Sequence, residues 1–194
     1  SKDSYIKHCR PICDFSSLSE SGSSYTVKKI YGSTRYTVDT TFYLNGLPTG
    51  SENLESSSLN EEISFLKILN IARKEKGLDP LEICQDLSRA ARYHSYDMGT
   101  QNYFQHSSFD RQGKCSNLEI VGSFADRCKR FLNVSGLAEN IAAGNYDAQS
   151  TYEQLYNSEG HYKNMFSEKY THIGIGFIKI PNSSYTYYWT TDFR

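Results

Sequence analysis

Two short stretches decide the fold of this chain: Ala138–Ile141, with the sequence AENI, and Asn157–Met165, with the sequence NSEGHYKNM. The first places a carboxylate, Glu139, in a short apolar strand, and the second places an imidazole, His161, beside a short helix. A second imidazole, His106, lies upstream in the segment NYFQHS. Whether these three side chains meet in space decides whether the chain has a chemical site.

The residues before these stretches predict two helices. From Leu59 to Lys76, apolar residues form a stripe so wide that the helix is expected to be mostly buried, and Gly77 suits the left-handed cap that ends it. The sequence DPLE at Asp79–Glu82 predicts the start of the next helix, because Asp79 can cap it and proline fits the first turn. Its core face continues at positions 84, 87, 91, 95 and 98. His94 falls near the edge of that face, where a histidine is usually packed and hydrogen-bonded.

The residues after position 120 predict short helices and an antiparallel sheet. Helices are expected at 124–131, after the cap Asp147, and at 161–166, with a strand at 137–143. Strands at 171–180 and 185–193 are joined by a turn and form an antiparallel pair. Gly174 and Gly176 leave one face of the first of these strands bare, so a helix is expected to pack closely there. The order of elements predicts an α+β fold with helices stacked on the sheet.

Residues 1–58 differ in character and are interpreted as an N-terminal extension to a domain at 59–194. Two β-branched and aromatic runs at 25–30 and 35–44 predict a β-hairpin, and Gly46–Ser58 predicts a linker or surface loop. The extension is either a partner-binding element or, as we favour, a cover over the domain, since an isolated hairpin is marginally stable.

The composition argues against two classes of partner. A net charge of −1 gives no electrostatic reason to bind nucleic acid or an anionic membrane surface. No apolar run approaches the roughly 20 residues that a transmembrane helix needs. The chain also carries no zinc-protease, nucleophile-elbow, phosphate-loop or dinucleotide motif.

Five cysteines leave the redox state open. Cys84 falls on the core face of a predicted helix and is expected to be a free, buried thiol. The other four form two disulfides most simply by pairing Cys9 with Cys13 and Cys115 with Cys128, although five reduced thiols are the alternative. Together with glycosylation sequons at Asn133 and Asn182, the cysteines favour a secreted, extracellular or cell-surface protein.

Four landmarks occur in order across residues 59–194: the segments YFQH, AENI and NSEGHYKNM, and a THIGIG strand leading to YWTTDF. With these landmarks the chain resembles the CAP superfamily (cysteine-rich secretory proteins, antigen 5 and plant pathogenesis-related proteins), in the compact form with Ser-x-Gly-His. The resemblance implies an α-β-α sandwich whose central cavity gathers two histidines and two acids. Carried over by position, these are His106, His161 and Glu139, while Ser158 stands where the second acid is found in longer members.

This set of residues allows three functions. Two imidazoles and one carboxylate could bind a divalent metal such as zinc, weakly because one carboxylate is missing, through His106, His161 and Glu139. The resemblance favours a secreted binding protein whose cavity, lined also by Ser158, takes a sterol, a fatty acid or a partner protein. A metal-dependent hydrolase is the alternative, and a purely structural polar network is the third. The absence of a general base beside the histidines favours the non-enzymatic function.

Overall fold

The computed structural model describes residues 26–31, 34–39, 47–110 and 118–194. Its central sheet has the strand order β3 (Glu82–Ile83), β7 (His172–Lys179), β8 (Tyr187–Phe193) and β6 (Ala138–Ala143). The pairs β7–β8 and β8–β6 are antiparallel, and the short edge strand β3 pairs in parallel with β7. The predicted α+β class is therefore confirmed, with one parallel edge strand added.

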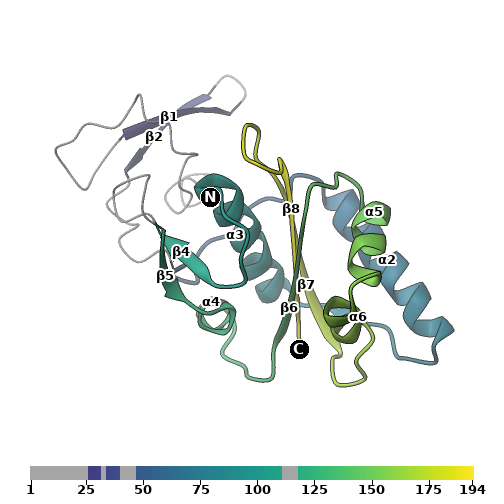
Figure 1. Ribbon diagram of the computed structural model, residues 1–194. Helices are drawn as coiled ribbons and strands as arrows, with labels where there is room; N and C mark the ends of the chain where they lie inside the picture. Colours follow the sequence, from purple (N-terminus) through teal and green to yellow (C-terminus); the bar gives the residue numbers. More distant parts are fainter. Residues whose placement is uncertain (1–25, 32–33, 40–46, 111–117) are drawn as a thin grey trace.

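The helices cover the sheet on both sides, as the α-β-α prediction requires (Figure 1). On one side lie α3 (Gln85–Gln101) and α4 (Phe124–Phe131). On the other lie α2 (Leu59–Glu75), α5 (Ala148–Tyr156) and α6 (Glu159–Met165). Each layer has its own apolar core, so the sheet is buried on both faces.

The close contact between α3 and β7 depends on two glycines. A Cβ atom at Gly174 would lie 2.2 Å from the backbone carbon of Leu87, and one at Gly176 would lie 2.2 Å from the backbone nitrogen of Arg92. The Ser95 hydroxyl also donates to the Gly176 carbonyl at 2.8 Å. The prediction that a helix packs against the bare face of this strand is confirmed.

The predicted start of α3 is wrong. The helix begins at Gln85 with Cys84 as its N-cap residue, so Cys84 is a half-buried free thiol rather than a residue of the helix face. The backbone N–H groups of Glu82 and Cys84 instead donate to the carbonyls of Thr171, just before β7, and Ile173 in β7, at 2.9 Å each. Pairing with a strand distant in sequence outweighs the local capping pattern.

The predicted burial of α2 is only partly right. Phe65 and Leu69 are fully buried, but Leu59, Ile63 and Ile71 are 56%, 44% and 61% exposed. The buried face also includes Arg73, whose guanidinium donates to the carbonyls of Asp79, Met165 and Ser167. Because hydrogen-bonded charged residues share the inward face, hydrophobicity alone predicts too wide a buried stripe.

Residues 47–58 pack onto the domain. Leu54 is 1% exposed within the α3-side core, and the Ser57 N–H donates to the Phe177 carbonyl at 2.9 Å. The carboxylate of Glu52 is fully buried and accepts from the N–H groups of Thr49 and Gly50, at 2.6 and 2.8 Å. The described part of the predicted linker thus belongs to the folded unit.

Two further strand pairs complete the described fold. The strands β1 (Thr26–Tyr31) and β2 (Thr34–Asp39) form an antiparallel pair, which confirms the predicted hairpin. The strands β4 (Ser108–Asp110) and β5 (Glu119–Gly122) form a second antiparallel pair, which the sequence did not predict.

We expect Gly176→Ala to lower the free energy of unfolding by at least about 2 kcal/mol, because the new methyl group would push α3 away from the sheet. The matched control is Gly160→Ala in α6, where no atom lies within 4 Å of the added Cβ and alanine favours the helix by up to about 1 kcal/mol. Urea unfolding of both variants measures the difference. Equal effects would contradict the close-approach explanation.

Candidate functional site

The centre of the candidate site is a hydrogen bond between His106 and Glu139. His106 lies in the loop between α3 and β4, and its Nδ1 is 2.9 Å from Oε1 of Glu139 on β6. Because the ionised carboxylate only accepts hydrogen bonds, Nδ1 carries the proton and Nε2 is the free nitrogen of the neutral ring. The His106 side chain is 50% exposed, whereas that of Glu139 is 1% exposed. A buried carboxylate therefore orients a half-exposed imidazole.

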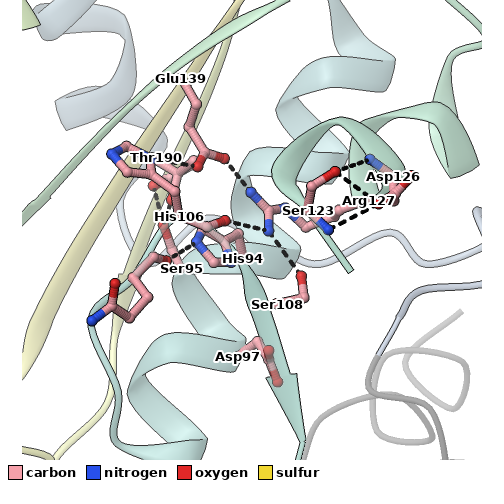
Figure 2. Close-up of polar contacts among 12 residues, drawn as sticks. His94, Ser95, Asp97, His106, Ser108, Ser123, Asp126, Arg127, Glu139 and Thr190 are labelled. Carbon is pink, nitrogen blue, oxygen red and sulfur yellow. Dashed lines mark hydrogen bonds and ion pairs between the residues drawn. The ribbon is translucent and has the colours of Figure 1, made fainter. Parts of the chain in front are cut away.

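Arg127 on α4 holds the other oxygen of this carboxylate (Figure 2). Its side chain is fully buried, and Nη2 donates to Oε2 of Glu139. Nη1 donates to the His106 carbonyl at 3.1 Å and to the Ser108 hydroxyl at 2.8 Å. One cation thus joins α4, the His106 loop and β6, and both oxygens of Glu139 are engaged.

A second carboxyl, Asp192 on β8, is the cross-strand partner of Glu139 and is fully buried. Burial and the neighbouring Glu139 charge raise the pKa of Asp192 well above its usual range, which favours its protonated form. Burial would also raise the pKa of Glu139, but Arg127 and His94 outweigh it and hold that pKa at about 2. Glu139 therefore supplies the negative charge that pairs with the Arg127 cation.

Neither Asp192 oxygen has a hydrogen-bond partner of ordinary geometry among the described residues, although Glu139 and Cys128 lie close enough to perturb its pKa.

His94 lies near the same charged groups. It is fully buried, and its Nε2 donates to the Gln105 carbonyl at 2.8 Å. Burial lowers the pKa of His94 to about 3, so the ring is neutral. His94 is a packed, hydrogen-bonded residue as predicted, although it lies within the core rather than at its edge.

His161 lies close to this centre without joining its hydrogen bonds. Asn140 donates from Nδ2 to the His161 carbonyl at 3.0 Å, and Asn164 donates to Oδ1 of Asn140 at 2.8 Å, so the two asparagines fasten α6 to β6. Burial lowers the pKa of His161, and the electrostatic effect of the nearby His106 imidazole lowers it further. The two histidines are thus within electrostatic range of each other.

Ser158 has no part in the recorded contacts of the polar centre. It is the N-cap residue of α6, where its carbonyl accepts from the Tyr162 N–H at 2.8 Å and its hydroxyl makes no capping hydrogen bond. The second carboxyl beside Glu139 comes from Asp192, not from the position of Ser158.

The three predicted metal ligands do not fit a metal ion in this arrangement. Glu139 already contacts His106 and Arg127, and the buried guanidinium places a positive charge directly beside its carboxylate. Within the described ranges, no group of three or more His, Cys, Asp or Glu side chains is placed to hold a metal. Metal binding by His106, His161 and Glu139 stays a prediction that this donor set does not support.

Cys128 is a free thiol on the inner face of α4, and it is fully buried. The predicted disulfide between Cys128 and Cys115 is therefore not confirmed. Burial raises the pKa of Cys128 above its usual range, which makes the thiol unreactive. Cys9, Cys13 and Cys115 lie outside the described residues.

The fold and these landmark residues can be compared with known proteins. A sequence model of the cysteine-rich secretory protein (CAP) family matches residues 66–193, more than half of the chain. The chain belongs to the CAP family. The resemblance inferred from the four landmarks is confirmed.

Two CAP relatives come from Bacillus subtilis. The uncharacterized protein YkwD is 35% identical over 119 residues, which is 61% of this chain and 42% of YkwD. The uncharacterized membrane protein YlbC is 32% identical over 126 residues, which is 64% of this chain and 34% of YlbC. The chain spans less than half the length of these curated relatives.

Solved structures share the CAP fold. An extracellular protein containing an SCP domain from Bacillus anthracis is 29% identical with a TM-score of 0.56, over 74% of this chain and 44% of that one. An outer surface protein from Borrelia burgdorferi has a TM-score of 0.59 over 73% of this chain and 97% of that one, and at 15% identity it shows the fold alone.

Sequence reasoning missed two central residues, Arg127 and Asp192, although each left a signal. Arg127 shares one face of its helix with Phe124 and Phe131, at spacings of three and four. The sequence therefore places a charged residue on an otherwise apolar face. Asp192 alternates with Trp189, Thr191 and Phe193 on a strand whose residues are buried on both faces.

Glu139 and Asp192 provide a matched test because they are neighbours whose pKa values are shifted in opposite directions. Glu139→Gln leaves the buried Arg127 cation unpaired, so we expect it to cost roughly 3–5 kcal/mol of unfolding free energy at pH 7. Asp192→Asn removes a carboxyl whose raised pKa opposes folding at pH 7, so we expect this variant to be at least as stable as the wild type. Chemical unfolding of the two variants measures both values.

The pH dependence of the two variants tests whether each carboxyl stabilises or destabilises the fold. The stability that Glu139 contributes is present above its usual pKa of 4.5 and is lost as the pH falls towards 2, so the cost of Glu139→Gln should shrink in acid. The pKa of Asp192 is raised, so its ionisation increasingly opposes folding as the pH rises above 3.8. The stability of Asp192→Asn relative to the wild type should therefore grow with pH, and opposite trends would contradict the assigned charges.

Proposed function

We propose that this CAP protein is an extracellular binding protein whose polar centre fixes the shape of the domain instead of acting on a substrate. The observation that carries this proposal is the engagement of both Glu139 oxygens, one by His106 and one by buried Arg127. A carboxylate in this state has no oxygen left to activate water or to complete a metal site without breaking a buried ion pair. Its physical role is to hold three elements in one arrangement.

The extracellular part of the proposal draws on the relatives. The Bacillus anthracis protein is described as extracellular and the Borrelia burgdorferi protein as an outer surface protein. No helix in the described part of this chain combines the length and apolar character needed to cross a bilayer. What is bound is proposed as a sterol, a fatty acid or a partner protein, as the family resemblance implies.

A hydrolase is the second candidate, and one observation favours it. Glu139 fixes His106 so that Nε2 is the basic nitrogen of a half-exposed ring, which is the arrangement that a general base requires. No described group is placed to hold a metal beside it, so water activation would depend on the imidazole alone. We favour binding because no described hydrogen bond joins His161 or Ser158 to this pair.

Native mass spectrometry on protein purified from its own source tests the proposal. We expect a co-purifying lipid or protein partner and less than stoichiometric metal. We also expect His106→Gln and His161→Gln to retain that partner, because neither change breaks the Arg127–Glu139 pair.

Assays of ester and peptide hydrolysis on the same samples provide the opposing result. Turnover that disappears in both histidine variants while circular dichroism shows an intact fold would overturn the binding proposal. A stoichiometric metal lost in His106→Gln would restore the predicted metal site.

A further inference from the structure

A groove lies on the opposite side of the sheet from the polar centre, between α2 and α5 (Figure 1). It has a volume of about 250 Å³, and Ala72 contributes to its lining. Glu75 and Lys76 contribute from α2, and Tyr152, Glu153 and Tyr156 contribute from α5. The proposed function uses none of these side chains.

The tyrosines of this groove belong to a continuous row of aromatic rings. Tyr156 lies 5.6 Å from Tyr152 and 5.2 Å from Tyr162, measured between ring centroids, and 5.9 Å from Phe166. At the α6 end of the row, Nζ of Lys76 lies 5.6 Å from the Tyr162 centroid and 5.2 Å from the Phe166 centroid. The row therefore already holds one cation over its ring faces.

The other end of the row has aromatic rings and negative charge but no cation of its own. Within the described ranges, no cationic side chain lies over Tyr152 or Tyr156, and Tyr156 is 39% exposed. Glu75 and Glu153 give the groove two carboxylates against the single ammonium of Lys76. One oxygen of Glu153 accepts from Gln149 at 2.7 Å, which leaves its second oxygen available.

We propose that the Tyr152–Tyr156 end of this groove binds an arginine side chain presented by a partner protein. A guanidinium can stack on a tyrosine face while its planar fork donates to a carboxylate at the rim, and this combination suits arginine better than lysine. The groove volume fits one long side chain rather than a folded element. Tyrosine and arginine are also the residues that most often dominate the binding energy of protein interfaces.

The same charges disfavour an anionic ligand here. A fatty-acid carboxylate would meet Glu75 and Glu153, and the Lys76 ammonium is already drawn to Tyr162. Burial, the neighbouring tyrosines and Glu75 together raise the pKa of Tyr152 to about 12, which agrees with negative charge at this end. The inference goes beyond the proposed function because it assigns a partner chemistry to a site independent of His106 and Glu139.

An NMR titration with the peptide acetyl-Gly-Arg-Gly-amide tests this site. We expect saturable shifts at Tyr152 and Tyr156, roughly tenfold weaker binding of the same peptide with neutral citrulline in place of arginine, and weakening by added salt. Absence of saturable shifts, equal affinity for the citrulline peptide, or tighter binding of laurate in this groove would overturn the proposal.

Variants locate the binding site on the intact chain. We expect Glu75→Gln and Tyr156→Ala each to weaken the arginine peptide by roughly three- to tenfold, with Tyr156→Phe retaining most of the affinity. The matched control is Glu55→Gln, which removes the same charge from an exposed residue before α2, at the opposite end of that helix. His106→Gln should leave the affinity for the arginine peptide unchanged. A negative result for this groove is therefore distinguishable from a negative result for the proposed function. Equal losses in Glu55→Gln and Glu75→Gln would overturn the assignment.

Discussion

The buried ion pair between Arg127 and Glu139 is the interaction on which the polar side of this fold depends. Both side chains are almost entirely removed from water, and an unpaired charge in that position would be strongly destabilising. Nη1 of Arg127 donates to the His106 carbonyl and to the Ser108 hydroxyl, so the cation also fixes a loop and a strand edge. Such a pair contributes specificity more than net stability, because hydrophobic residues of similar volume can stabilise a core as well.

The chemistry open to His106 follows from this pair. Glu139 orients the imidazole, but its charge is balanced by Arg127 before any ligand arrives. A metal ion would have to compete with a guanidinium that cannot lose its proton and has no route to water. The raised pKa of Asp192 agrees with this balance, since a second ionised carboxyl would leave the buried centre with an excess negative charge. The negative charge of Glu139 is therefore already balanced by Arg127 inside the protein, which suits a structural role in a binding protein.

Much of the fold could be predicted from the sequence because local patterns and tertiary packing agree. The glycines of β7, the Asp147 cap of α5 and the apolar face of α4 each predict the element that the structure contains. The landmark segments then led to the family, and His106, Glu139 and His161 lie near one another as the resemblance implies. These successes depend on signals that span fewer than about ten residues.

The failures share a different cause, which is that their determinants lie far apart in sequence. Strand β3 has two residues, and only its hydrogen bonds to β7 distinguish it from the start of a helix. Arg127 and Asp192 are charged residue types that composition rules place at the surface, and the burial of Arg127 becomes favourable only because Glu139 pairs with it in space. The spacing of longer relatives places a second acid at position 158, where this chain has Ser158, whereas strand pairing places a different acid, Asp192, beside Glu139.

Strand register ultimately determines which chemistry lies on which side of the sheet. The pairing of β6 with β8 places Glu139 opposite Asp192 on the α4 side, while Ala142 and Trp189 belong to the core beneath α2 and α5. A register slip of one residue would turn the carboxyls towards that apolar core and the indole ring towards Arg127. Such a slip would therefore be unfavourable on both faces of the sheet. The ion pair and the aromatic packing thus select the same register from opposite sides. This agreement explains how a small domain can keep a charged centre on one face of its sheet and an aromatic binding groove on the other.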